Sequence, residues 1–504
     1  MRSRKVVLPI HVVSERRFAA SSGSPFATWL DAAVLCIVFA AGLAHLRSPF
    51  GGDQFLFTIG AAKIAHHGVI YRDFWDLKQP MIYYIYAVSG MLFGFSQSGV
   101  HLFEAFYQTA FAGVLIRACL PRFRYRWAAS IVPLLTIAAY YGFANDGALA
   151  SVEAFAGFPI FVACVFAADA FTTERGATSN ALIAGAAGAV AASLKFAFFP
   201  LVVAMWVTAL ALCLRSGDRR HMLNVALLLA LGCAATFGAL GSYLAGTGVL
   251  GDALRTAFIE PPAILRQLAP AYRSPMQSEV RTFAGAMWPL VALAIAGAIA
   301  RWRRMDVFTA QLLVWTGVGA ALVDAEVWSY YYKFFILIVP IGLLAAGGLE
   351  ALWTTAAKGG RFPRIAIAAL LLIMLASSTR TIARVQSGLR TFAREQHDAV
   401  SSSVAFLDRA DARSGPIYVF GDPRLYYFSG RDQAIAINGY SPALLLPARW
   451  HELVRELEAA APPYIMIERD YEPSVHVSSA TMRFIASSYR VAYASSDGTW
   501  YEHR

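Results

Sequence analysis

The chain has 504 residues, of which 58% are hydrophobic and only 15% charged, and its mean hydropathy is +0.51. This composition excludes an ordinary soluble globular protein and indicates a polytopic α-helical membrane protein. The net charge of +11 would suggest a nucleic acid partner in a soluble protein. Here we attribute it to basic residues on cytoplasmic loops and expect no nucleic acid partner.

Residues 1–28 are basic and contain no long apolar run, so we interpret them as a cytoplasmic N-terminal segment. A cleaved signal peptide is disfavoured, because no clear small-x-small site follows and many apolar segments come later. A span needs about twenty apolar residues. On that rule we expect spans within residues 29–380, near Trp29–Leu46, Gly99–Cys119, Trp127–Phe143, Ala154–Thr172, Ala181–Leu194, Phe196–Leu214, Met222–Leu244, Phe283–Ala300, Val307–Leu322, Tyr331–Trp353 and Ile365–Ser378.

The apolar segment Met81–Phe95 is short and is interrupted by Gly90 and Gly94. If it does not cross the membrane, all the basic loops fall on the side of the basic N-terminus. The positive-inside rule therefore favours about eleven crossings plus one re-entrant or surface helix. The first loop, residues 47–98, and the tail, residues 381–504, are then extracytoplasmic.

Five cysteines lie in apolar segments without metal-ligand spacing, which predicts small core side chains rather than disulfides or metal ligands. Most acidic residues between the spans fall instead at the predicted external face, near helix ends. Ionisable groups are costly there unless they are hydrated or used. We therefore expect an outward-facing active site at the membrane surface. The acidic residues concerned are Asp53, Asp73, Asp76, Asp146, Glu153, Asp252, Glu260, Asp324 and Glu326.

The tail changes abruptly to a polar composition in which strand and helix patterns alternate. It predicts a small extracytoplasmic α/β domain with a supporting or acceptor-contacting role. Its sequence contains no glycine-rich phosphate loop, metal cluster or catalytic triad. The expected strands are Ile417–Phe420, Ala434–Ile437, Tyr464–Ile467 and a closing hairpin from Arg490 to Glu502, with helices at Gln386–Leu407 and Pro447–Ala460.

Charged residues crowd into the first loop. Asp53 could cap a helix that runs to about His66, and the cap alone is the structural alternative for this residue. A cap does not require the other polar residues of the loop, which favours a functional role. The adjacent His66 and His67 suit a helix end better than a metal site. The accompanying residues are Lys63, Tyr71, Asp73, Asp76, Lys78 and Pro80.

The order of these motifs resembles the polytopic GT-C glycosyltransferases, especially the family 39 and aminoarabinose-transferase-like branch. The resemblance extends over nearly the whole chain. Two departures stand out: the family commonly has Asp-Glu where this chain has Asp53-Gln54, and Lys-Pro-Pro where it has Lys78-Gln79-Pro80. A histidine expected before the late aromatic run is replaced by Ser329 or Tyr330. The matching stretches are Asp53, Gly68–Asp73, Lys78–Pro80, Lys195, Tyr330–Lys333 leading into Pro340, and Gly421–Gly430.

The resemblance implies a bacterial cytoplasmic (inner) membrane enzyme that moves a hexosyl or pentosyl group from a polyprenyl-phosphate-linked donor. The acceptor would be a hydroxyl group of a lipid, glycan or protein, and the transfer would invert the anomeric centre. Asp53 would be the general base. No cofactor is required by the sequence and no metal ligands are assigned, although a divalent cation could bridge the carboxylates. The expected substrate-binding residues are Lys78, Lys195, Tyr71, Arg72, Asp73, Asp76, Asp146 and Glu153.

Structural alternatives stay open for several of these residues. Lys78 could simply extend its ammonium group to the membrane interface, Lys195 could mark a loop, and Asp146 or Glu153 could begin a helix. Two other functions also remain: a transporter or flippase for lipid-linked sugars, and a non-catalytic membrane scaffold with an external binding domain. A transporter would require buried charge near the midplane, and no inverted repeat is visible in the sequence.

Overall fold

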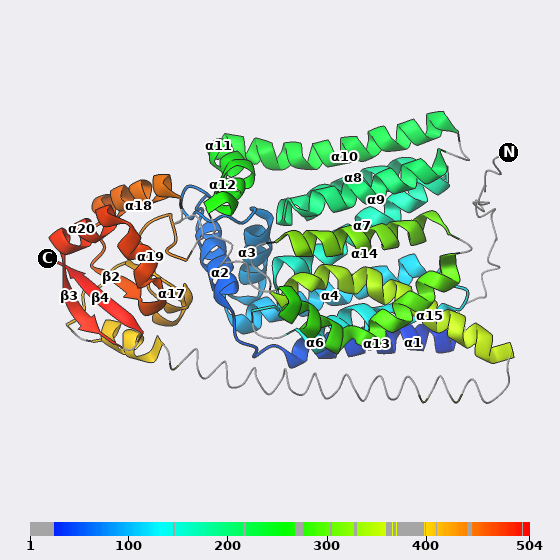
Figure 1. Cartoon of the computed structure of the whole chain (residues 1–504), viewed down its shortest axis with the longest axis horizontal. Helices are drawn as coiled ribbons and strands as arrows, with labels where there is room; N and C mark the ends of the chain where they lie inside the picture. Colours follow the sequence, from blue (N-terminus) through cyan, green and yellow to red (C-terminus); the bar gives the residue numbers. More distant parts are fainter. Residues whose placement is uncertain are drawn as a thin grey trace.

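The computed structural model describes residues 25–144, 147–214, 218–267, 276–302, 305–326, 330–358, 365, 369, 398, 400–409, 411–440, 446–495 and 497–504. A long helical bundle is joined at one end to a small α/β domain formed by the tail (Figure 1). The prediction of a polytopic membrane protein with a small C-terminal α/β domain is therefore confirmed.

The predicted spans fall on helices of the bundle. Six described helices, α7, α8, α10, α13, α14 and α15, are long and apolar enough to cross a membrane, whereas the apolar stretches Thr28–Ala44 of α1 and Phe198–Cys213 of α9 are shorter. The last predicted span, Ile365–Ser378, lies almost entirely outside the described residues. The bundle contains α1 (Pro25–Ala44), α4 (Gln97–Cys119), α5 (Arg126–Ser130), η1 (Leu134–Ala138), α6 (Ala139–Phe143), α7 (Val152–Thr172), α8 (Ala177–Leu194), α9 (Phe198–Cys213), α10 (Arg219–Gly246), α13 (Met276–Trp302), α14 (Val307–Ala325), η4 (Tyr331–Phe334) and α15 (Phe335–Lys358).

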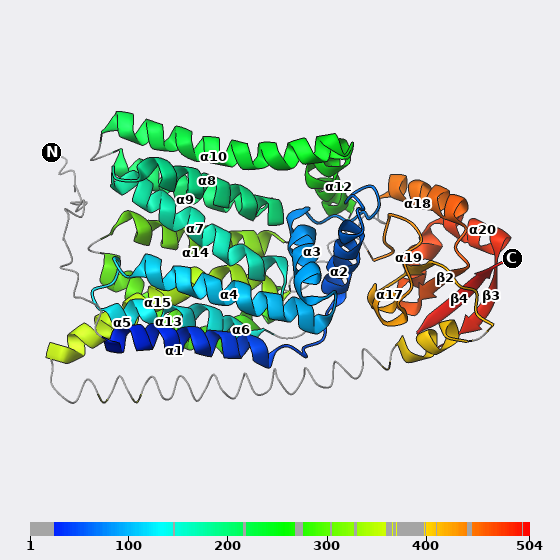
Figure 2. The same cartoon turned by 180° about the vertical axis from the view of Figure 1, so that it is seen from behind.

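The first loop forms two helices, α2 (Gly52–Ala65) and α3 (Met81–Phe93), which lie across the end of the bundle rather than along it (Figures 1 and 2). With 13 residues, α3 is about 20 Å long, well short of the bilayer core. The expected surface or re-entrant helix at Met81–Phe95 is therefore present.

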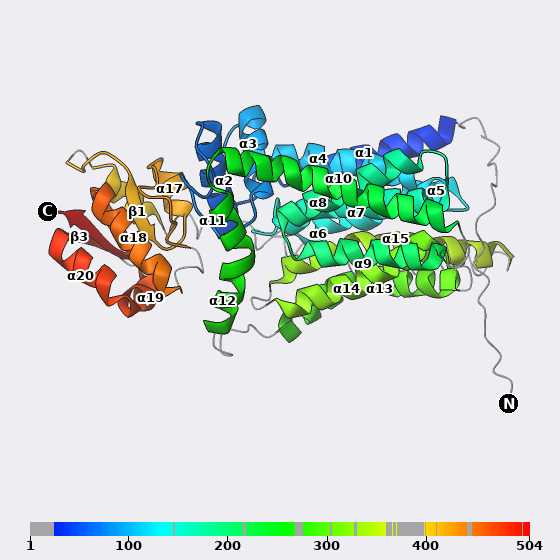
Figure 3. The ribbon, with the colours of Figure 1, turned by 90° about the horizontal axis from the view of Figure 1, so that it is seen from above.

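The first loop and the α/β domain share one end of the bundle, whereas the basic loop between α4 and α5 lies at the other end (Figure 2). A third segment joins the first loop at its end: α11 (Leu250–Leu254), η2 (Arg255–Ile259) and α12 (Glu260–Gln267), which stand between the bundle and the domain (Figure 3). The basic loop between α4 and α5 thus lies opposite the first loop, as the sequence predicted.

The domain is built on a four-stranded sheet in the order β1-β2-β4-β3. β1 and β2 are parallel, and the other two pairs are antiparallel. Its elements are β1 (Ile417–Phe420), α17 (Arg424–Ser429), α18 (Pro447–Ala460), β2 (Tyr464–Glu468), η6 (Arg469–Tyr471), α19 (Glu472–Val477), α20 (Ser479–Ser488), β3 (Tyr489–Ala494) and β4 (Gly498–His503).

Four of the five predicted strands are confirmed, including both strands of the closing hairpin, but the strand predicted at Ala434–Ile437 is wrong. That segment forms no strand; Ile437 makes an isolated bridge to Trp75 of the first loop. Ala434 donates its backbone N–H to the carbonyl of Ile417 in β1 at 2.9 Å, and the carbonyl of Ala436 accepts from the N–H of Trp75, so the segment links β1 to the first loop. The predicted helix Gln386–Leu407 lies largely outside the described residues, although residues 400–407 are helical.

Trp75 joins three segments that are distant in sequence. Its backbone N–H donates to the carbonyl of Ala436 at 2.9 Å, and its indole N–H donates to Thr256 Oγ1 at 3.2 Å. The guanidinium of Arg449 lies over the indole, 4.0 Å from the ring centroid, at a distance typical of a cation–π contact. The first loop, the segment after α10 and the domain thus meet at one buried indole.

Arg449 also forms an ion pair with Glu260, with 2.6 Å between Nη2 and Oε1, and the two side chains are only 3% and 2% exposed. A buried ion pair is costly to break because the remaining charge stays out of water. Arg255 reaches the same carboxylate at 3.2 Å, but its side chain is 44% exposed and compensates only in part.

We therefore expect Arg449→Ala to reduce the free energy of unfolding by about 3 kcal/mol, because it leaves Glu260 buried with a weaker partner. Thermal unfolding in detergent measures the effect. Arg490→Ala is the matched control, since Arg490 pairs with Glu502 at the surface and such pairs contribute about 1 kcal/mol or less. Equal losses in the two variants would contradict this interpretation.

Candidate functional site

The N-terminus of α2 presents Asp53 to Lys78. The helix N-cap is Gly51, and Asp53 makes no capping hydrogen bond there. Its Oδ2 instead accepts from Lys78 Nζ at 2.8 Å. The structural alternative of a helix cap is therefore wrong for Asp53, and the two residues singled out by the motifs form an ion pair.

Lys78 is cationic and remains accessible, with 37% of its side chain exposed. Burial alone would lower its pKa, but the Asp53 and Asp76 carboxylates outweigh that effect and raise the pKa of Lys78 above its ordinary value. The ammonium group also lies 6.0 Å from the centroid of the Phe57 ring. Lys78 can thus present a fixed positive charge to an anion.

The remaining predicted residues of the first loop are engaged within the loop itself. Tyr71 has a positive φ of 72° and donates its hydroxyl to the carbonyl of Lys78 at 2.9 Å. Asp76 is buried and accepts from the Tyr83 hydroxyl at 2.7 Å; burial raises the pKa of Asp76. These contacts give Tyr71 and Asp76 a structural role beside Lys78, and their predicted substrate contacts stay predictions.

Asp73 and Arg72 form a partly exposed pair at the edge of the loop. Asp73 Oδ2 accepts from the N–H of Val69 at 2.7 Å and from Arg72 Nη2 at 2.9 Å. The hydrogen bonds from Arg72 lower the pKa of Asp73. This pair closes the turn that carries Tyr71, and its arginine is available at the surface.

A second charged cluster lies where α7, α8, α14 and η4 end or begin. Lys195, the residue after α8, lies 2.9 Å from Glu153 Oε1 in the first turn of α7, and it also contacts Glu326. Glu326 in turn pairs with Lys333 of η4. Lys195 is therefore balanced by two carboxylates rather than standing alone as a cation.

Glu326 and Lys333 were not predicted as site residues. Both lie at helix boundaries on the predicted external face, which is the signal that could have identified them. Glu326 pairs with Lys195, which is 131 residues away in the sequence. Asp146, predicted beside Glu153, lies outside the described residues.

The two clusters interact electrostatically, and the domain contacts the first of them. Glu153 also contributes to the raised pKa of Lys78. Tyr440 of the domain lies against the N-terminus of α2, since a Cβ on Gly52 would come 2.3 Å from its hydroxyl. Burial raises the pKa of Tyr440, and the charge of Asp53 adds to the shift. Within the described part of the chain, no group of three or more His, Cys, Asp and Glu side chains could hold a metal ion.

The sequence matches no family model and no curated protein. The structure, however, matches solved membrane proteins over nearly its whole length. ArnT from Cupriavidus metallidurans bound to undecaprenyl phosphate matches with a TM-score of 0.61 at 15% identity, covering 94% of this chain and 97% of ArnT. The apo form of the same protein gives a TM-score of 0.62 at 14% identity, with the same coverage.

A second match is the archaeal oligosaccharyltransferase AglB from Archaeoglobus fulgidus, in complex with an inhibitory peptide and a dolichol-phosphate. Its TM-score is 0.58 at 13% identity, covering 95% of this chain and 75% of AglB. At such low identity these matches establish the fold. The chain has the same fold as ArnT and AglB, which is the GT-C fold that the resemblance implied.

Lys195 separates the carboxylates of Glu153 and Glu326, so Lys195→Met should destabilise the protein by about 2 kcal/mol. We expect a lower melting temperature in detergent and partial recovery when Glu153→Gln is added, because the second substitution removes the uncompensated charge. Lys358→Met, at the exposed end of α15, is the control. A melting temperature unchanged by Lys195→Met would show that the cluster does not contribute to stability.

Proposed function

We propose that this protein transfers a sugar from a polyprenyl-phosphate-linked donor to a hydroxyl group of a lipid, glycan or protein acceptor, with inversion. The Asp53–Lys78 ion pair carries the proposal. This pair sets a carboxylate and an ammonium group side by side in a chain whose fold is that of ArnT and AglB. Structures of those two proteins contain undecaprenyl phosphate and dolichol-phosphate, respectively.

In the proposed reaction the donor phosphate attracts the Lys78 ammonium away from Asp53. The freed Asp53 carboxylate accepts the proton of the acceptor hydroxyl, and the acceptor oxygen forms a bond to the anomeric carbon. The bond from that carbon to the phosphate oxygen breaks, and its electron pair stays on the polyprenyl phosphate. Lys78 stabilises the charge that develops there.

The second cluster lies within the electrostatic field of Lys78. We assign Glu153 and Lys195 to binding the sugar or the acceptor. The carboxylate can accept a hydrogen bond from a hydroxyl group, and the ammonium group can donate one to it. Arg72, which is partly exposed at the edge of the loop, is a further phosphate contact in this proposal. Asp146 keeps its predicted substrate-binding role.

The site would face the extracytoplasmic side of a bacterial inner membrane. The basic loop between α4 and α5 lies at the opposite end of the bundle (Figure 2), and basic loops are retained in the cytoplasm. The donor lipid would then approach from the outer leaflet. Against a transporter, the two clusters lie at the ends of helices rather than at the middle of the bundle.

Asp53→Asn keeps the shape of the side chain but removes its ability to accept the proton, so kcat should fall by about 10²–10⁴-fold. Binding of undecaprenyl phosphate should change far less. Transfer by purified protein is measured with a panel of polyprenyl-phosphate sugars. Asp432→Asn, at an exposed carboxylate near Lys63, is the control. Undiminished transfer by Asp53→Asn would exclude the base, and failure of the wild type with every donor would favour a transporter or a scaffold.

Lys78→Met should weaken the binding of undecaprenyl phosphate by about tenfold or more, because a charge-assisted contact to phosphate is lost. Titration of the purified protein with the lipid measures this. Lys63→Met, in α2 of the same loop, should bind normally. In our proposal Lys78 provides the positive charge, so EDTA should leave transfer unchanged. Loss of transfer that Mg²⁺ or Mn²⁺ restores would instead place a divalent cation among the carboxylates.

A further inference from the structure

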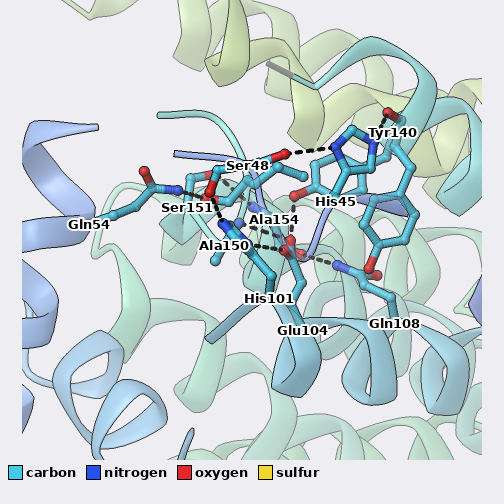
Figure 4. A network of polar contacts seen from close by, with 12 residues as sticks. His45, Ser48, Gln54, His101, Glu104, Gln108, Tyr140, Ala150, Ser151 and Ala154 are labelled. Carbon is cyan, nitrogen blue, oxygen red and sulfur yellow. Dashed lines mark hydrogen bonds and ion pairs between the residues drawn. The ribbon is translucent and has the colours of Figure 1, made fainter. Parts of the chain in front are cut away.

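Gln54 follows Asp53 directly and occupies the position where the resembling family commonly has glutamate. Its side chain is buried, with 1% exposed. The side-chain oxygen accepts from the N–H of Gly51, and the side-chain NH₂ donates to the carbonyl of Leu149. Figure 4 shows the amide nitrogen of Gln54 directed toward the segment that carries Ala150 and Ser151. Gln54 thus satisfies the backbone N–H of Gly51 at the start of α2 and the backbone carbonyl of Leu149 in a separate segment.

The carbonyl of Leu149 belongs to the turn at residues 147–151, which several other groups hold in place. The N–H of Ala150 donates to Glu104 Oε1 at 2.8 Å, and the hydroxyl of Tyr86 donates to the carbonyl of Ala150 at 2.9 Å. Ala150 has a positive φ of 50°, a left-handed conformation that is unfavourable for a residue with a Cβ. The turn keeps this conformation because its backbone groups have fixed partners.

The same turn leads directly into the second cluster. Ser151 caps α7, and Glu153 lies in the first turn of that helix and pairs with Lys195. The backbones of the two segments also touch, since a Cβ on Gly51 would lie 2.6 Å from the Cα of Gly147. The position of the turn therefore sets where Glu153 lies relative to Asp53.

We propose that Gln54 is a positioning residue that fixes the spacing between the Asp53–Lys78 pair and the Glu153–Lys195 pair. The inference rests on the proposed function and extends it to a residue that does not touch the substrate. A glutamine is needed because the side chain must accept at Gly51 and donate at Leu149. An ionised glutamate can only accept, so it would face the carbonyl of Leu149 with a buried, repelled charge.

Gln54→Glu and Gln54→Leu test this assignment. A protonated glutamate again offers one acceptor and one donor, and burial raises the pKa of a carboxylic acid. At pH 8 we expect Gln54→Glu to have a melting temperature at least about 5 °C below the wild type. We also expect kcat to be about tenfold lower with little change in KM. By about pH 5.5 the melting temperature and kcat of Gln54→Glu should return to the wild-type values measured at that pH. Gln54→Leu should remain impaired at both pH values.

The other titratable groups around the turn are Glu104 and His101 of α4, Tyr86 of α3, Tyr140 of α6 and Asp53 itself. They are present in all three proteins. Gln54→Leu therefore reports any pH response that comes from these groups rather than from the introduced carboxyl.

Wild-type behaviour of Gln54→Glu at pH 8, or a gain in kcat, would overturn the assignment. So would a defect that is equally large at both pH values. The melting measurements and the affinity for undecaprenyl phosphate require no turnover, so they decide the hydrogen-bonding role even if the wild type transfers no sugar. Failure of wild-type transfer would count against the proposed function alone, whereas a normal, pH-independent melting temperature for Gln54→Glu would count against the role of Gln54 alone.

Discussion

The cost of placing charge in hydrocarbon constrains the rest of this structure. The helices of the bundle contact one another through small residues: a Cβ on Gly185 of α8 would lie 2.1 Å from the carbonyl oxygen of Leu229 on α10. Such packing is typical of membrane helices and leaves little room for polar side chains. The ion pairs of the two clusters are accordingly gathered where helices end. Glu104 is an exception, and its buried carboxylate accepts from both Tyr140 and Ala150.

The domain holds this end of the bundle in shape. The first loop is hydrogen-bonded to the domain through Trp75 and to the bundle through Gln54, so Lys78 is carried by a segment fixed on both sides. Charged groups that are already fixed in place need little reorganisation when charge develops during a reaction, which is how electrostatic preorganisation lowers a reaction barrier. A domain without recognisable catalytic motifs can therefore contribute to the chemistry by holding the loop.

Features that depend on local sequence could be predicted, and those that depend on distant partners could not. The period and length of the apolar segments located the bundle helices, and the brevity of Met81–Phe95 separated it from the spans. The segment Ala434–Ile437 has the composition of a strand, but it divides its backbone hydrogen bonds between Ile417 of β1 and Trp75 of the distant first loop. Asp53 could be assigned to a site, yet its ion pair with Lys78 depends on how the loop folds back. Lys195 was expected to face an anion, and only the fold shows Glu153 and Glu326 beside it.

The charge balance of the site links these observations. Asp53 is matched by Lys78, while Glu153 and Glu326 are matched by Lys195 and Lys333. These six side chains carry no net charge together, and in the proposed reaction the phosphate gains the Lys78 cation only when that ammonium group leaves Asp53. Binding of the donor would then free the base at the moment when the leaving group needs its counter-charge. A glutamate at position 54 would add a negative charge beside Asp53 and oppose the phosphate. The neutral amide of Gln54 holds the two clusters at a fixed spacing without disturbing that balance.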